Sequence, residues 1–501
     1  MNNSYWIHSI NLKSFPKLEK DLEVTVAIIG GGITGLSTAY YLSQNGYDVC
    51  ILEKDKLAHH ATGNTTAKVT SQHDLFYDYL IHTFGKSFAK SYLDANEEAI
   101  KNIKEIIDTE KIDCDFEWQD AYVYTDLEDE VIKIKNEVTS VNSLDFPAEF
   151  VTDSSLPFPI KACIKFPNQA QFHPLKYVKG LSDCIVQNGG QIYENTKVYD
   201  IDKKDDFYEI RTDNHTIHAK YVVLACHYPI VNTPGFYFLK MYQETSYLIG
   251  FTTDSKLFDG MYINTKSPIC SLRTVPYKED KRLVLMGGSE HKTGVKEDLS
   301  DCYLNLENRA KELFPDANVL YRWNTEDCIS LDKIPYIGEF SQMMPHMYIA
   351  TGFKKWGMTT SNIAANIITD MIMGKENPYA ETFKSTRFNP VKNGTEFVDM
   401  LKQTTTSLVL DKFKIPKDTL GSINKDEGKI VEVENTKLGI YRDTEGKYFC
   451  LKPICSHLGC ELSWNNLDKT WDCPCHGSRF SYTGKSLYDP SIKDIELINI
   501  D

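Results

Sequence analysis

The glycine motif Gly30-x-Gly32-x-x-Gly35 most constrains what this 501-residue chain can fold into. An apolar run of strand length, residues 24–29, precedes the motif, and a helical pattern of apolar residues follows it through residue 42. Glycines at these spacings allow a tight turn, a close backbone approach to a pyrophosphate and close packing of the helix. The positive N-terminus of the helix then faces the phosphates. The segment therefore predicts a strand, turn and helix that bind a nucleotide.

A second strand that ends in a carboxylate completes this unit. Gly46 stops the helix, and YDVCILE resumes as a strand that ends at Glu53. An acidic side chain about 20 residues beyond the glycines can bind the ribose hydroxyls of a dinucleotide. The glycine motif alone is weak evidence, and a purely structural glycine-rich turn is the alternative. With both strands, the helix and the acid in place, the sequence predicts dinucleotide binding by an α/β domain.

Length and charge narrow the class of protein. A chain of this length exceeds what one hydrophobic core supports, and about 150 residues per domain predicts roughly three domains. The formal net charge of -15 gives an acidic surface that repels phosphate backbones and anionic lipid, so we expect no nucleic-acid or membrane partner. The first residues lack a secretory pattern, and glycines and threonines interrupt the apolar stretch of residues 24–42. We therefore expect no membrane span and a cytoplasmic location.

Two further regions differ from the nucleotide-binding unit. Strand-like runs dominate residues 240–290 and predict a sheet in a second lobe, and an α/β pattern returns at residues 348–374. After Pro378 the sequence is polar and irregular through about Lys417, which is typical of a connector. A β-rich tail begins near Ser422. The chain is therefore predicted to combine an α/β region, interleaved with a second lobe, and a C-terminal all-β domain.

Several segments together resemble one flavoprotein family. The glycine motif, VYDI at residues 198–201, YVVLACH at 221–227 and YIATGFKKWGMTT at 348–360 resemble the D-amino-acid oxidase-like (DAO) family of FAD-dependent oxidoreductases, over roughly residues 20–380. The resemblance implies FAD as the cofactor, in a Rossmann-like lobe interleaved with a mixed-sheet substrate lobe. The predicted boundaries are 1–380 for the oxidoreductase (FAD-binding lobe approximately 20–75, 165–230 and 325–380; substrate lobe approximately 76–164 and 231–324), 381–417 for a linker and 418–501 for the C-terminal domain.

The resemblance also implies which residues contact FAD. The family places a backbone group at the position of Val198 on the adenine, and the loop of residues 352–358 beside the flavin ring. A second flavin-contacting loop corresponds to residues 58–74, which are rich in small hydroxyl side chains. The predicted FAD-binding residues are Gly30, Gly32, Gly35, Glu53, Lys54, Thr62, Thr66, Val198, Gly352, Gly357 and Met358.

Three details of FAD binding stay open in the sequence: the helix after Gly357, covalent attachment and the turn at His227. A helix that begins after Gly357 would aim its positive end at the pyrimidine side of the flavin, whereas a helix that packs without touching the cofactor is the alternative. Some relatives attach FAD covalently through a histidine in this loop, so His59 or His60 is a candidate, against ordinary loop histidines. His227 stands where the family has a glycine, which questions the local turn but not the cofactor.

Near the end of the chain, Cys455-x-His457 and Cys473-x-x-His476 provide two thiolates and two imidazoles from two loops separated by fifteen residues. Structural zinc is the alternative, but zinc loops commonly use CxxC or HxxxH spacing. CxH paired with CxxH is the Rieske arrangement, in which two cysteines bind one iron and two histidines bind the other. The full strings CSHLGC and CPCHGS closely resemble the Rieske domains of cytochrome bc-type complexes. The resemblance implies a 2Fe-2S cluster with these four ligands.

The two strings contain four cysteines, of which only two are predicted ligands. The same resemblance accounts for the other two and shows two positions at which this chain differs from the family. It implies a disulfide between Cys460 and Cys475 that joins the cluster loops. Ser478 matches a serine that hydrogen-bonds a bridging sulfide, whereas Phe480 replaces a tyrosine that donates to a cysteine sulfur. Because losing a donor makes the reduced cluster less stable, we predict a lower potential than in the respiratory relatives. The covering loop is altered to LYDPSI, with Pro490 as its remnant.

The two centres together predict an oxidoreductase that transfers electrons. No second GxGxxG follows a strand, so electrons are expected from an organic substrate rather than from NAD(P)H. By resemblance, the substrate is an amine or amino acid, and FAD passes electrons through the cluster to an unknown acceptor. The alternative is a redox sensor or electron-transfer protein without amine turnover. A Rieske-type oxygenase is disfavoured, because no mononuclear-iron domain follows the cluster.

The sequence determines catalytic residues poorly, because flavin amine oxidation needs a positioned, neutral amine more than a dedicated acid-base pair. Arg273 is a candidate for binding a substrate carboxylate, against the alternative of a surface arginine. Lys355 and Trp356 are candidates for groups that face the flavin ring, against packing between the lobes.

Overall fold

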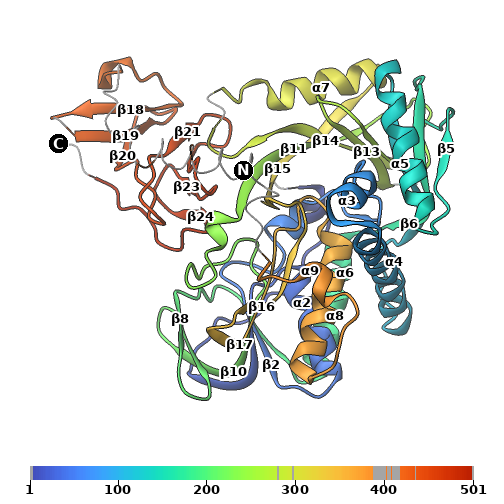
Figure 1. Cartoon of the computed structure of the whole chain (residues 1–501). Helices are drawn as coiled ribbons and strands as arrows, with labels where there is room; N and C mark the ends of the chain where they lie inside the picture. The colour runs from blue at the N-terminus through green and yellow to red at the C-terminus, as the bar shows by residue number, and fades with distance from the viewer. Residues whose placement is uncertain are drawn as a thin grey trace.

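The computed structural model describes residues 4–278, 281–295, 298–387, 402, 408, 418–434 and 436–498. Two interleaved lobes form the larger part of the molecule, and a smaller all-β region, coloured orange to red, lies at the upper left of Figure 1. Most of the predicted linker, residues 381–417, lies outside the described residues. Within the part of the chain that the structure describes, no helix is both long and apolar enough to cross a membrane.

The first lobe, at the bottom of Figure 1, is built on a mainly parallel sheet ordered β16-β17-β10-β1-β2-β7. The central strand β1 pairs in parallel with β2 and β10, and its last four residues are buried. A strand covered on both faces is nearly continuously apolar, as residues 26–29 of β1 are. The strands of this sheet are β1 (Leu22–Ile29), β2 (Val49–Leu52), β7 (Gln191–Tyr193), β8 (Asp200–Lys203), β9 (Tyr208–Arg211), β10 (Thr216–Leu224), β16 (Tyr336–Ser341) and β17 (Met344–Thr351).

Helices pack around this sheet and between the lobes. Helix α2 follows β1 directly and packs against α6 and α8, and α8 also packs against the long helix α4. The predicted strand, turn and helix at the glycine motif are thereby present. The helices of both lobes are α1 (Tyr5–Ser9), α2 (Ile33–Gln44), α3 (Tyr77–Phe84), α4 (Lys86–Thr109), α5 (Val131–Ser143), α6 (Pro174–Gln187), α7 (Asp301–Leu313), α8 (Gly357–Met373) and α9 (Ala380–Phe383).

The second lobe contains a mixed sheet ordered β15-β11-β14-β13-β12-β4-β6-β3. Strand β3 lies within the residues predicted for the FAD-binding lobe, approximately 20–75. Its residues Lys68 and Val69 instead pair with β6 and so belong to this second sheet. The loop predicted to contact the flavin therefore leads directly into the substrate lobe. The strands are β3 (Lys68–Val69), β4 (Glu117–Thr125), β5 (Glu149–Val151), β6 (Ala162–Gln171), β11 (Met241–Thr252), β12 (Met261–Asn264), β13 (Cys270–Pro276), β14 (Arg282–Lys292) and β15 (Asn318–Ser330).

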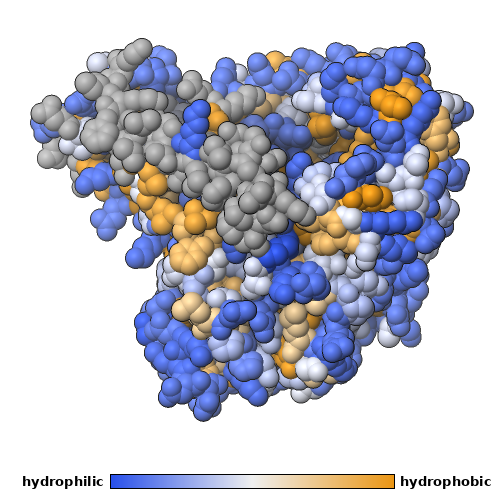
Figure 2. All heavy atoms as spheres, viewed as in Figure 1, coloured by the Kyte–Doolittle hydropathy of each residue, from blue (hydrophilic) through white to orange (hydrophobic). Residues whose placement is uncertain are grey.

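The C-terminal region consists of two small antiparallel sheets, β18-β19-β20 and β21-β22-β23-β24. In the face of the molecule that Figure 2 shows, most residues are hydrophilic, and hydrophobic residues gather at the left, where this region meets the first lobe. The strands are β18 (Glu427–Val433), β19 (Thr436–Arg442), β20 (Tyr448–Leu451), β21 (Ser463–Asn465), β22 (Thr470–Asp472), β23 (Arg479–Ser481) and β24 (Ser486–Tyr488).

Candidate cofactor sites

A cavity lies at the carboxyl ends of the parallel strands β1, β2, β10 and β17, between the two lobes. Open α/β sheets bind their ligands at this edge of the sheet. All but one of the predicted FAD-binding residues line the cavity. The lining residues among them are Gly30, Gly32, Glu53, Lys54, Thr62, Thr66, Val198, Gly352, Gly357 and Met358.

The exception, Gly35, has a packing role. A Cβ atom at Gly35 would lie 2.0 Å from the carbonyl oxygen of Gly30, so no larger residue fits where α2 crosses β1. This close approach brings the N-terminus of α2 to the cavity, where its backbone N–H groups can meet a pyrophosphate.

Side chains from two other segments organise the glycine turn. The Thr62 hydroxyl accepts a hydrogen bond from the Ile33 N–H at 3.1 Å. The carboxylate of Glu53 accepts bonds from the backbone N–H groups of Gly31, at 2.8 Å, and Asp55, at 2.9 Å. Glu53 is therefore fixed at the end of β2, with its side chain at the cavity wall. The hydroxyl groups of Thr34 and Ser361 lie 2.8 Å apart and tie α2 to the first turn of α8.

Two buried polar atoms at the cavity are consistent with a bound FAD. His227 Nε2 and Trp356 Nε1 belong to cavity-lining residues, and neither atom has a hydrogen-bond partner among the described residues. Buried polar groups normally have partners, so these two atoms suit a ligand that supplies acceptors or donors. Burial lowers the pKa of His227 to about 4, which leaves the imidazole neutral. Among the described residues, His227 is not one of those with a left-handed backbone conformation. The turn therefore does not require the glycine that the family has at this position.

The two histidines considered for covalent attachment lie beside the cavity. His60 Nε2 is 2.9 Å from Asp55 Oδ2, and its ring meets the edge of Tyr488 from the C-terminal region at 5.4 Å between centroids. Burial lowers the pKa of His59. Covalent attachment stays a prediction for either residue.

The three catalytic candidates differ in their access to the cavity. The Arg273 guanidinium is buried and donates to the backbone carbonyl groups of Thr66 and Ala67, and in the described part of the chain it is not among the cavity-lining residues. It therefore supports the flavin loop from behind and is not placed to bind a substrate carboxylate. Lys355 and Trp356 do line the cavity.

Contacts limit what these two cavity residues can do. The Lys355 ammonium pairs with Glu290 at 3.2 Å and Glu244 at 3.4 Å. The Trp356 ring stacks on His73, with 4.7 Å between centroids. Trp356 is thus held rigidly, and the charge of Lys355 is already compensated.

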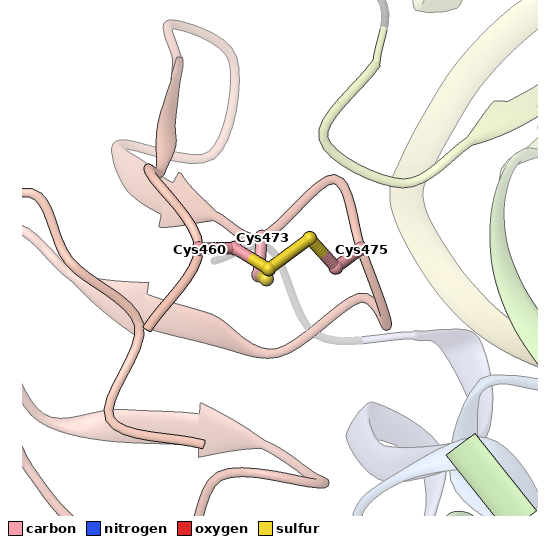
Figure 3. Close-up of side chains that lie close together, drawn as sticks. All are labelled: Cys460, Cys473 and Cys475. Carbon is pink, nitrogen blue, oxygen red and sulfur yellow. A yellow bond between two sulfur atoms is a disulfide. The ribbon is translucent and has the colours of Figure 1, made fainter. Parts of the chain in front are cut away.

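In the C-terminal region, two loops of matching backbone geometry bring the predicted cluster ligands together. In the first loop, the Cys455 N–H donates to the Cys460 carbonyl at 2.8 Å, and in the second, the Cys473 N–H donates to the Ser478 carbonyl at 2.8 Å. The Cys460–Cys475 disulfide joins the loops, as predicted. Figure 3 shows the Cys473 side chain beside that of Cys460, with the disulfide reaching across to Cys475.

The four predicted ligands present the donor set of a Rieske cluster. The rings of His457 and His476 lie 5.1 Å apart and nearly perpendicular, and among the described residues neither buried Nδ1 atom has a hydrogen-bond partner. Burial lowers the pKa of His457 to about 4 and that of His476 to about 3, so both rings are neutral, as metal ligands must be. A hydrogen bond from the Cys473 thiol lowers the pKa of Cys455 to about 7. The residues present therefore fit the cluster.

The ring edges of His457 and His476 that lie away from the unpartnered Nδ1 atoms face residues 232–238 of the two larger lobes, called the flavoprotein lobes below. His457 Nε2 donates to Asn232 Oδ1 at 2.7 Å, and the His476 ring hydrogen-bonds the backbone of Phe238. The Phe238 ring meets both imidazoles edge-on, at 6.3 Å from His457 and 5.8 Å from His476. The residues 232–238 that cover this edge lie more than 200 positions before the ligands, and no sequence signal pairs the two segments.

A buried ion cluster also joins the C-terminal region to the second lobe. Arg479 is fully buried and pairs with Asp468 at 2.6 Å, Glu326 at 2.8 Å and Asp472 at 3.0 Å. Glu326, on β15, also accepts hydrogen bonds from Thr293 and Thr245. Burial raises the pKa of Glu326 to about 7, although Arg479 opposes the shift.

The LYDPSI loop, residues 487–492, lies between the two sites. Tyr488, Asp489 and Ile492 line the flavin cavity, where Lys54 pairs with Asp489 at 3.0 Å. On the other side, the Ser491 N–H donates to the Ser478 hydroxyl at 3.0 Å, next to the cluster ligands. The altered loop around Pro490 thus contacts both sites.

Phe480 packs in the apolar core that contains Cys455 and Cys473, and it is fully buried. Its predicted effect on the potential stays a prediction.

Comparison with known proteins identifies both parts of the chain. The profile of a family described as FAD dependent oxidoreductase (DAO) matches residues 25–371, and that of the Rieske [2Fe-2S] domain matches residues 416–499. The chain therefore belongs to the DAO family of FAD-dependent oxidoreductases and ends in a Rieske domain. This result confirms the predicted class of enzyme, its FAD and its 2Fe-2S cluster. The assignment of individual cofactor-binding residues stays a prediction.

Particular relatives share one or both parts. A Bacillus subtilis (strain 168) protein, YhfW, named as a Rieske 2Fe-2S iron-sulfur protein, is 38% identical over 498 residues, 99% of this chain and 98% of that protein. Gamma-glutamylputrescine oxidoreductase of Escherichia coli (strain K12) is 22% identical over 395 residues, 74% of this chain and 89% of the relative. The crystal structure of glycine oxidase from Geobacillus kaustophilus superposes with a TM-score of 0.64 at 20% identity, covering 74% of this chain and 100% of that one. This likeness confirms the predicted fold of the oxidoreductase part.

Proposed function

We propose that the enzyme oxidises a small amine or amino acid and delivers the electrons through its Rieske domain to an external acceptor. The proposal keeps the division into an oxidoreductase (residues 1–380), a linker (381–417) and a cluster domain (418–501). It also keeps Cys455, His457, Cys473 and His476 as the cluster ligands. When bound, FAD would accept a hydride from the substrate and the cluster would accept electrons one at a time.

The observation that supports this route best is the contact between the cluster histidines and residues 232–238. His457 and His476 reach this segment through Asn232 and the Phe238 backbone. The same segment continues into β11, where Met241 contacts the Thr351 hydroxyl at 3.9 Å, next to Gly352 at the cavity. A continuous packed chain therefore connects the cluster ligands to the loop predicted beside the flavin ring.

The residues of the chain hold this arrangement fixed. Arg479 and Glu326 lock the C-terminal region onto β15, and Lys54 and Asp489 close the cavity at its other side. Both ion pairs are shielded from solvent, which favours a stationary domain over a mobile one. At the cavity, Trp356 is immobilised by its stack on His73, so the wall near the predicted ring position is rigid.

The test is anaerobic mixing of the holoenzyme with a panel of amines and amino acids, with flavin absorbance and the EPR signal of the cluster followed together. We expect a substrate to bleach the flavin first and then to raise the signal of the reduced cluster. Flavin bleaching that leaves the cluster oxidised would exclude the internal route. If no amine or amino acid reduces the flavin, the alternative function, a redox sensor or electron-transfer protein, is supported instead.

A further inference from the structure

Lys68 is a buried lysine at the flavin cavity, and no carboxylate of the described residues forms an ion pair with its ammonium. Its side chain lines the cavity, and the residue is 8% exposed. The ammonium donates to the carbonyl oxygen of Tyr262 at 2.9 Å and to the Ser271 hydroxyl at 2.7 Å, and both acceptors are neutral. Among the ion pairs of the described residues, none includes Lys68. A buried charge without a counter-charge is costly, so the site favours an anion.

Three other lysines that line the cavity are partly exposed and have acidic partners. Lys54 pairs with Asp489 at 3.0 Å, Lys354 with Asp74 at 3.2 Å and Lys355 with Glu290 at 3.2 Å. Each of these ammonium groups is compensated within the protein. Lys197 also lines the cavity without an ion pair among the described residues, but it precedes Val198, the residue predicted to contact the adenine. Among the cavity lysines away from that position, Lys68 is therefore the one left to attract an anionic group.

The position of Lys68 in the fold suits a substrate. Lys68 lies on β3, where the loop predicted to contact the flavin enters the substrate sheet, and its two acceptors belong to β12 and β13 of that sheet. Arg273 fixes the preceding carbonyl groups of Thr66 and Ala67 and so holds this short strand in place. The ammonium thus lies at the wall of the cavity that the substrate lobe forms.

Electrostatics agree with this geometry. Burial and, to a smaller extent, Arg273 lower the pKa of Lys68 to about 7, although Asp74 and Cys270 oppose the shift. A carboxylate placed against the ammonium would restore its charge, because an opposite charge at short range favours the protonated form.

We propose that Lys68 binds an anionic group of the substrate, so that the enzyme acts on amino acids that carry a carboxylate and not on simple amines. The inference rests on the proposed function and narrows its substrate class. Lys68 takes the role for which the sequence makes Arg273 a candidate.

The test uses binding to the oxidised holoenzyme, which needs no turnover. Benzoate and its neutral counterpart benzamide are titrated in turn, and the perturbation of the flavin absorbance gives Kd. We expect benzoate to bind the unaltered enzyme at least about tenfold more tightly than benzamide, as a hydrogen bond between charged groups allows. Equal affinity of the two compounds for the unaltered enzyme would overturn the proposal without any variant.

Variants locate the effect. Lys68→Met is expected to raise the Kd of benzoate by about tenfold or more and to leave the Kd of benzamide unchanged. Lys68→Arg is expected to keep most of the affinity for benzoate. Lys179→Met, on the exposed face of α6, is the matched control and is expected to leave both Kd values unchanged. Benzoate binding that survives Lys68→Met, or loss of FAD from this variant, would overturn the proposal.

The outcomes also separate the inference from the proposed function. If simple amines reduce the flavin and the Kd of benzoate does not change in Lys68→Met, the proposed function is retained and the anion site is rejected. If benzoate binds through Lys68 but no amine or amino acid reduces the flavin, the anion site stands and the amine oxidation falls.

Discussion

The two cofactor sites of this chain are assembled in opposite ways. All four predicted cluster ligands come from one stretch, residues 455–476, on two loops that close their own hydrogen bonds. The walls of the flavin cavity come from segments near residues 30, 53, 62, 198 and 352, which only the folded sheets bring together. The cluster site is therefore local in its ligands, yet its histidine edge is covered by residues 232–238 of the flavoprotein lobes. Ligation can be encoded locally, while the surroundings that tune a centre belong to the whole fold.

The largest expected effect tests the local character of the cluster site. Cys473→Ser removes one predicted ligand, and we expect the EPR signal of the reduced cluster to be lost while FAD stays bound, because residues 473–478 are not among those that line the flavin cavity in the described part of the chain. Cys450→Ser, which alters a buried thiol outside the motif, is the control and should keep the signal. Loss of FAD together with the cluster would show that the two sites do not assemble independently.

The next effect tests the fixed docking of the two regions. Arg479→Met leaves the buried carboxylates of Glu326 and Asp472 without their counter-charge, and breaking such a pair costs about 3–5 kcal/mol. We expect a matching drop in the free energy of unfolding, measured with a denaturant. Arg309→Met removes two solvent-accessible pairs, with Glu312 and Asp126, and should cost less than about 1 kcal/mol for each pair. Equal losses in the two variants would contradict a stabilising interface.

The sequence anticipates these two sites unequally. The chemical pattern of CSHLGC and CPCHGS specifies the ligands and, by resemblance, the disulfide, because short loops keep neighbouring residues together. The glycine motif and Glu53 predict the nucleotide end of the cavity for the same reason. The charge of Arg273 makes it a candidate for binding a carboxylate, against a surface arginine, but the side chain is buried and its guanidinium donates to backbone carbonyl groups. Lys68 lies in the loop of residues 58–74 that the resemblance places at the flavin, but nothing in the sequence distinguishes it from its neighbours there. Asn232 and Glu326 carry no signal, since their roles depend on contacts between segments distant in sequence.

A third effect sharpens the contrast between Lys68 and the compensated lysines at the cavity. Benzoate should bind the protonated form of Lys68, whose pKa is about 7 in the free enzyme. Affinity is therefore expected to be flat below that value and to fall by up to about tenfold per pH unit above it, because binding then requires uptake of a proton. Burial is the main cause of this midpoint, and Arg273, Asp74 and Cys270 act on the same ammonium. Titrations between pH 6 and about 9 measure the slope, which Lys68→Arg should remove. A slope that persists in Lys68→Arg would assign the proton to another group.

A smaller effect tests whether the flavoprotein lobes tune the cluster. The Asn232 carbonyl accepts from His457 Nε2, which makes the ring a better electron donor and favours the oxidised cluster. Asn232→Ala should therefore raise the midpoint potential, by about 40 mV if the bond is worth about 1 kcal/mol. Redox titration followed by EPR measures this shift, and Asn214→Ala in a distant hairpin is the control. An unchanged potential would mean that residues 232–238 cover the cluster without influencing it.

The smallest effect concerns a residue of the local site itself. Phe480 is fully buried in the core that holds Cys455 and Cys473, and it cannot donate a hydrogen bond to sulfur. Phe480→Tyr adds a hydroxyl donor, and because a donor stabilises the more negative reduced cluster, the midpoint potential should rise. Sulfur is a weak acceptor, so the rise should not exceed about 40 mV. Phe480→Leu, which removes the ring and adds no donor, controls for repacking of this core. If both variants shift the potential equally, packing around the cluster sets its potential and the missing hydroxyl does not.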